Sequence, residues 1–157
     1  MELTQLVIQR VFAECEKHML RIRTASADMV SMMPLTEHAY SNLNDEQVRV
    51  VDQFLFRFSK LQDVVGEKLF KTLLLLLDEP VENLPFLDIL NRLEKLELIE
   101  SAQTWRELRY DRNDLAHNYE DDPVEAANLI NNLYNKREVL FGFVDRIKKY
   151  YEEHLKE

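Results

Sequence analysis

The residues best suited to chemistry gather in one short stretch, residues 105–119, with the sequence WRELRYDRNDLAHNY. This stretch contains the only tryptophan of the chain, a ladder of three arginines, and His117 followed two residues later by Tyr119. A guanidinium matches phosphate oxygens through paired hydrogen bonds, and an imidazole titrates near neutral pH. These residue types favour a reaction at a phosphate group, in which His117 transfers protons and Arg112 stabilises the developing charge.

A helix must position these groups, because Ser101 can cap its start and no glycine or proline interrupts the stretch. Spacings of three and four residues place one set on a single helix face: Trp105, Leu108, Arg112, Leu115 and Tyr119. Arg112 occupies a position on this face where the pattern predicts an apolar side chain. Because burying a lone guanidinium is costly, Arg112 needs an ion-pair or hydrogen-bond partner, or a polar cleft. On the neighbouring face Asn113 and His117 lie four residues apart, with Arg109 one turn earlier. We expect Arg109 and Asn113 to bind or orient a substrate there.

Residues 112–119, RNDLAHNY, resemble the R-x4-6-H signature of the HEPN superfamily, and more narrowly the R-x4-H-x-Y version of HepT-type toxins. Residues 52–70, DQFLFRFSKLQDVVGEKLF, resemble the second long helix of the same group. The similarity covers roughly residues 45–150. It implies a helical HEPN-like domain and a metal-independent endoribonuclease encoded beside a minimal nucleotidyltransferase antitoxin.

The same resemblance implies the roles of three residues and a partner. Arg112 and His117 would be catalytic, and the sites of two protomers would meet across a homodimer. Tyr119 matches the tyrosine to which the partner transferase of HepT-type proteins attaches AMP groups. RNA is then the expected substrate, and no cofactor is expected.

Composition limits the other classes of function. The net charge of −9 opposes general nucleic-acid binding, so an RNA site needs a local basic cleft. Two glycines are too few for a dinucleotide or P-loop fingerprint, and the four histidines lack metal-ligand spacing, so we expect no metal site. No apolar run reaches the length of a membrane span, and the single cysteine, Cys15, fits a reducing cytoplasm.

The chain as a whole predicts one all-α domain over residues 1–157, an up-and-down bundle of four long helices plus one short helix. The predicted helices are 2–32, 44–77, 85–97 (the short one), 101–118 and 122–153, with a loop at 34–43. His18 is expected on the surface, and Gly66 either admits a close helix contact or is a weak point. Apolar residues at 69–77 exceed one helix face, which predicts burial against a partner.

Two other interpretations stay open at this point. The protein could be a non-catalytic subunit that binds a nucleotide or substrate for a nucleotidyltransferase. It could also be a helical interaction protein in which the motif arises by chance. Cleavage of RNA in the presence of EDTA, compared with His117→Ala, separates these alternatives.

Overall fold

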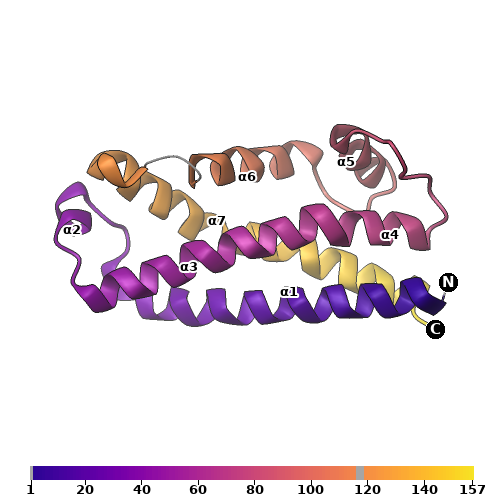
Figure 1. Cartoon of the computed structure of the whole chain (residues 1–157), viewed down its shortest axis with the longest axis horizontal. Coiled ribbons are helices and arrows are strands. Elements are labelled where there is room, and N and C mark those ends of the chain that lie inside the picture. Colours follow the sequence, from indigo (N-terminus) through magenta and orange to yellow (C-terminus); the bar gives the residue numbers. More distant parts are fainter. Residues whose placement is uncertain (1, 116–118) are drawn as a thin grey trace.

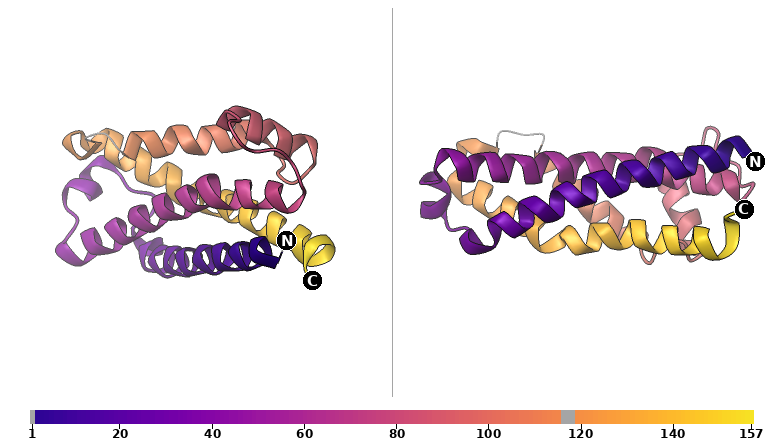
Figure 2. Two further views of the ribbon diagram at one scale, coloured as in Figure 1. Left: turned by 45° about the vertical axis from the view of Figure 1, so that its right-hand side comes forward. Right: turned by 90° about the horizontal axis from the view of Figure 1, so that it is seen from below.

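Three long helical rods form the body of the protein, as seen in a computed structural model that describes residues 2–115 and 119–157 (Figure 1). The first rod is α1 (Glu2–Met29), which a 3-10 turn extends to Met32. The second joins α3 (Asp45–Val64) to α4 (Phe70–Leu76) through a π-helical turn, Val65–Leu69. The third is α7 (Pro123–Tyr150), followed by a π-helical turn at Tyr151–Leu155. The three rods lie lengthwise beside one another (Figure 2).

Three shorter helices complete the fold: α2 (Glu37–Ser41), α5 (Phe86–Lys95) and α6 (Ala102–Leu115). A 3-10 turn, Tyr119–Asp121, precedes α7. No strand occurs among the described residues, which confirms the predicted all-α helical bundle. The predicted loop at 34–43 is wrong in one respect, because it contains α2. Thr36 caps that helix by accepting a hydrogen bond from the Ala39 amide at 3.0 Å.

Side-chain caps begin the helices where the sequence predicts them. Asn44 and Gln47 form a reciprocal capping box at the start of α3, with hydrogen bonds of 2.8 and 2.9 Å. Ser101 accepts from the amide of Thr104 at 3.1 Å and so caps α6. Asp122 accepts from two amides in the first turn of α7, directly before Pro123. The caps of α3 and α6 fix the starts of two helices that line the pocket described below.

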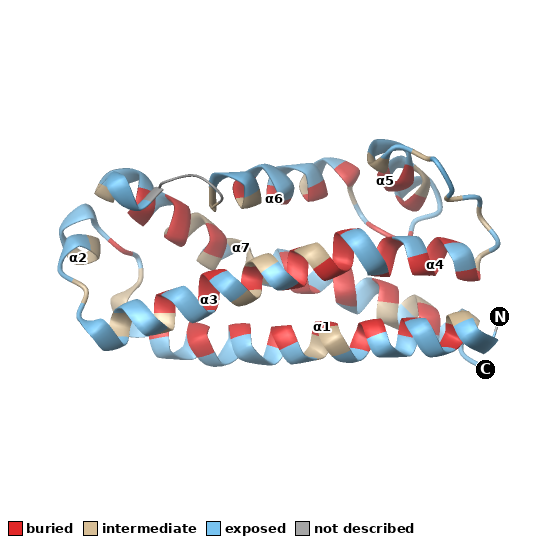
Figure 3. Ribbon diagram, in the orientation of Figure 1, coloured by how far each residue is buried: buried red, intermediate tan, exposed pale blue. Residues whose placement is uncertain are grey.

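The core lies between the rods, where the buried faces of α1, α3 and α7 meet (Figure 3). The apolar excess at 69–77 is covered by the chain itself, because α4 packs against α1 and α5. Phe70, Leu73, Leu74 and Leu76 are buried, and Leu75 is the large apolar side chain of this segment that stays exposed. The prediction that this segment needs a partner chain is therefore wrong. None of the described helices is long and apolar enough to cross a membrane.

Candidate phosphate pocket

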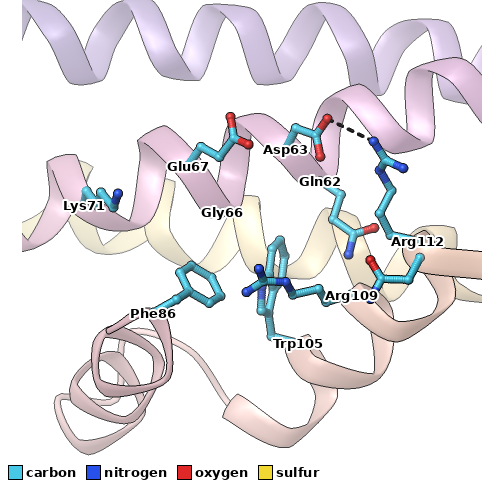
Figure 4. A pocket seen from close by; sticks show the side chains of 10 residues that line it. Gln62, Asp63, Gly66, Glu67, Lys71, Phe86, Trp105, Arg109 and Arg112 are labelled. Carbon is cyan, nitrogen blue, oxygen red and sulfur yellow. Dashed lines mark hydrogen bonds and ion pairs between the residues drawn. The ribbon is translucent and has the colours of Figure 1, made fainter. Parts of the chain in front are cut away.

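A pocket of about 330 Å³ lies between α6 and the second rod, at the π-helical turn (Figure 4). π-helical turns inside long helices are frequent at functional sites. Phe86 of α5 closes one side of the pocket. The lining residues are Gln62, Asp63, Gly66, Glu67, Lys71, Phe86, Trp105, Arg109, Arg112 and Asn113.

Trp105 holds α6 against the rest of the pocket wall. Its indole is almost fully buried and makes edge contacts with Phe70 and Phe143, at centroid distances of 4.8 and 5.1 Å. A Cβ atom on Gly66 would lie 3.1 Å from Cζ2 of this ring. Of the two interpretations of Gly66, the close helix contact is therefore the correct one.

Arg112, the residue out of pattern on the apolar face, lies in the pocket wall as the sequence requires. Its Nη2 is 3.5 Å from Oδ2 of Asp63 on α3, and about a third of its side chain (32%) is exposed. Its Nε is buried and has no hydrogen-bond partner among the residues that the structure describes. A contact of 3.5 Å is at the weak limit of a hydrogen bond. The guanidinium thus keeps donor capacity that the described protein groups do not use.

Arg109 and Asn113 line the same pocket, as their spacing from Arg112 predicts. The guanidinium carbon of Arg109 lies 4.8 Å from the ring centroid of Phe86, which holds the side chain by a cation–π contact. With Lys71, the pocket has three cationic side chains against the carboxylates of Asp63 and Glu67. The pocket lining is therefore net positive in a chain whose net charge is −9.

Two predicted site residues cannot be placed against this pocket. His117 and the side chain of Tyr119 lie outside the described part of the chain. The backbone of Tyr119 begins the 3-10 turn Tyr119–Asp121. Of the five predicted site residues, the structure brings together Arg109, Arg112 and Asn113.

Several pocket residues were not predicted as functional. Gln62 of α3 is buried, and its Oε1 has no hydrogen-bond partner among the described residues. Lys71 and Phe86 reach the pocket from α4 and α5, segments without any motif. In the sequence, Gly66 was the one indication of this side of the pocket. It interrupts an apolar helix, and in the structure it lies in close contact with Trp105.

His18 is not a surface residue, contrary to the prediction. It is 8% exposed, and its Nδ1 lies 3.1 Å from Nη1 of Arg57 on α3. Burial, and then the neighbouring Arg57 charge, lower the pKa of His18 below its ordinary value. The imidazole is thus neutral at pH 7 and can accept a hydrogen bond from the guanidinium.

A second pocket, of about 440 Å³, is larger but lacks cationic groups in its lining. Tyr40, Asp52 and Glu120 are its main polar residues. Burial, with the charges of the two carboxylates, raises the pKa of Tyr40. An anion would be repelled there, so a phosphate group favours the pocket beside α6.

No group of three or more His, Cys, Asp or Glu side chains in the described ranges is arranged to hold a metal ion. Comparison of the sequence with protein-family models gives no match, and neither the curated proteins nor the solved structures contain a match to it.

Proposed function

We propose that the protein is a metal-independent endoribonuclease of the HEPN type, acting as the toxin of a pair with a minimal nucleotidyltransferase antitoxin. The observation that carries the proposal is Arg112. A cationic side chain stands on the apolar face of α6, opens into a pocket with Arg109 and Lys71, and has donors without a strong protein partner. A phosphodiester of RNA would supply the missing acceptors.

The proposed reaction is attack of a ribose 2′-oxygen on the adjacent phosphorus. The bond from phosphorus to the 5′-oxygen breaks, which leaves a 2′,3′-cyclic phosphate and a 5′-hydroxyl. His117, five residues after Arg112 in the sequence, would take the proton from the 2′-hydroxyl. Arg112 would stabilise the negative charge that builds on the non-bridging oxygens.

In an in-line displacement the attacking 2′-oxygen and the departing 5′-oxygen lie on opposite sides of the phosphorus, and one imidazole does not easily reach both, so the scheme uses two copies of the chain. His117 of the second copy would give a proton to the departing 5′-oxygen. The homodimer rests on this chemistry and on the family resemblance, because the apolar segment at 69–77 is covered within one chain. Light scattering at micromolar concentration should give the mass of a dimer, and a monomeric mass would contradict the two-copy site.

Cleavage of single-stranded RNA in EDTA tests the reaction. We expect wild type to cleave, and His117→Ala and Arg112→Ala to lose activity by about 100-fold or more. The matched controls are His38→Ala, an exposed histidine of α2, and Arg106→Ala, an exposed arginine of α6 outside the pocket. Both should keep wild-type activity, and an RNA with 2′-O-methyl groups should resist cleavage. Activity that survives His117→Ala would refute the scheme.

A second candidate function is binding without cleavage, which the size of the pocket favours. About 330 Å³ is within the range of small-molecule sites, and the same cations would hold a nucleotide phosphate. Titration with ATP, followed by the fluorescence of Trp105, separates the two. Saturable binding that Arg112→Ala removes, with no RNA cleavage by wild type, would favour the binding subunit.

Modification of Tyr119 by the antitoxin is the regulatory part of the proposal. Each AMP adds a phosphodiester charge and a nucleoside, which could occupy Arg112 and exclude RNA. The test is co-expression with a minimal nucleotidyltransferase of the kind proposed as the partner, followed by intact-mass measurement. A gain in AMP units that Tyr119→Phe abolishes supports the switch, and an unchanged mass beside an active transferase contradicts it.

A further inference from the structure

An exposed aromatic side chain stands on α3 outside the pocket described above. Phe56 is 53% exposed, whereas the other seven phenylalanines of the chain are buried or partly buried. Its neighbours Phe54 and Phe58 point into the core. Leaving this ring in water forgoes the favourable burial of a large apolar surface.

Two cationic side chains lie over the ring. The guanidinium carbon of Arg57 and the Nζ of Lys60 lie 5.7 and 5.5 Å from its centroid. Neither cation has a carboxylate partner within 4.0 Å among the described residues. Arg57 contacts the neutral His18 instead, and its Nε is buried without a partner in the same part of the chain. The chain has a net charge of −9, yet these two cations have no carboxylate partner among the described residues. Together with the exposed ring, they suit an external anion that carries an aromatic group.

This patch continues into the phosphate pocket along one face of the helix. Phe56, Lys60, Asp63 and Glu67 are spaced by four, three and four residues, which places them on one face. Asp63 is the partner of Arg112, so the ring lies two helical turns, about 10 Å along the axis, from the level of the pocket.

Carboxylates limit the patch at its other end. Asp52, one turn before Phe56, lines the second pocket together with Tyr40 and Glu120. An anionic strand would therefore run from Arg112 to Phe56 and turn away before Asp52. Asp63, the carboxylate within this path, is already paired with Arg112.

We propose that Phe56 stacks a base of single-stranded RNA, and that Arg57 and Lys60 hold the backbone of the same strand. A phosphate of this strand lies at Arg112, so the proposal rests on the proposed ribonuclease function. Single-stranded nucleic acids are held in this way, by stacking of bases on aromatic rings and by cations along the backbone. The patch would accept any base, because stacking does not depend on hydrogen-bond readout.

Binding of a short single-stranded RNA to the His117→Ala protein tests this role without cleavage. The RNA carries 2-aminopurine, whose fluorescence is quenched on stacking. We expect Phe56→Leu, which keeps the apolar bulk but not the π-system, to weaken binding by about 10-fold and to lose the quench. Phe56→Trp should restore both, and Lys60→Gln should weaken binding and flatten its salt dependence. Leu20→Ala and Lys149→Gln, exposed positions on α1 and α7, are the matched controls and should bind as the parent does.

The outcomes separate this inference from the proposed function. If wild type cleaves RNA and Phe56→Leu binds with full affinity and quench, the stacking role is refuted and the ribonuclease stands. If wild type does not cleave but binding still needs an aromatic residue at 56, the ribonuclease is refuted and the stacking site stands. If Phe56→Leu changes the mass of the protein from dimer to monomer, the ring is a contact between copies and the proposal is overturned.

Discussion

The packing of the pocket can be tested by adding a single methyl group at Gly66. In Gly66→Ala the new Cβ would lie 3.1 Å from Cζ2 of Trp105, whereas carbon atoms pack best at about 3.5–4.0 Å. The indole must therefore shift by roughly 0.5 Å. It has little room to do so, because it is buried between Phe70 and Phe143.

Two opposing terms set the size of the effect. Replacing glycine by alanine inside a helix stabilises it by about 1 kcal/mol. Overpacking a tight core contact costs about 1–3 kcal/mol. We expect Gly66→Ala to lower the free energy of unfolding by about 0–2 kcal/mol. Gly142→Ala on α7 is the matched control, since its Cβ meets no atom within 4 Å. That variant should gain up to about 1 kcal/mol.

Urea unfolding of both variants, followed by fluorescence, measures the difference. Trp105 is the only tryptophan, so its emission reports directly on the contact. We expect a changed native emission spectrum in Gly66→Ala and an unchanged one in Gly142→Ala. Equal stabilisation of both variants, with identical native spectra, would show that the ring moves freely and would refute the packing argument.

Three further predictions concern buried polar groups. Burial raises the pKa of the Cys15 thiol to about 12, so native protein should resist iodoacetamide at pH 8 while unfolded protein reacts; fast native labelling would contradict this. The pKa of His18 is lowered in the folded state, so the unfolded state binds more protons just below pH 6.5. The free energy of unfolding should therefore rise with pH through that window and then level off. His18→Gln, which can still accept from Arg57, should flatten this rise in urea titrations, and an unchanged slope would exclude His18 as its source. Lys136→Met removes the 2.7 Å partner of the largely buried Asp111 and should cost about 1–2 kcal/mol, most of which a second change, Asp111→Asn, should restore.

The sequence predicted the fold well where local rules decide it. The all-α class, the capping box at Asn44 and the cap at Asp122 follow from spacing and from residue type within one turn. Three of the five predicted site residues also line one pocket, because Arg109, Arg112 and Asn113 share one edge of a helix.

The wrong predictions concern contacts between distant parts of the chain. An apolar excess at 69–77 shows that more than one face is covered, but it does not show that α1 and α5 cover it. His18 is buried where α1 packs against α3, and its partner there, Arg57, is 39 residues away in the sequence. The helix α2 has only five residues, too few for a periodic pattern to be recognised. Lys71 and Phe86 became site residues through packing alone.

The two halves of α6 are attached to the protein in different ways. The first half is anchored by the buried side chains of Trp105 and Leu108. The second half relies mainly on two ion pairs, from Asp111 to Lys136 and from Arg112 to Asp63, with Leu115 only partly buried. Ion pairs of this exposure weaken as ionic strength rises.

Salt would therefore act on this site twice. It competes with RNA phosphates for the cations, and it also loosens the helix that carries Arg112. The slope of log Kd against log salt concentration is usually converted into a number of phosphate contacts. Here that slope should exceed the value expected from the number of contacts made. Replacing the Asp111–Lys136 pair by neutral groups, which leaves Arg112 in place, should bring the slope closer to that value.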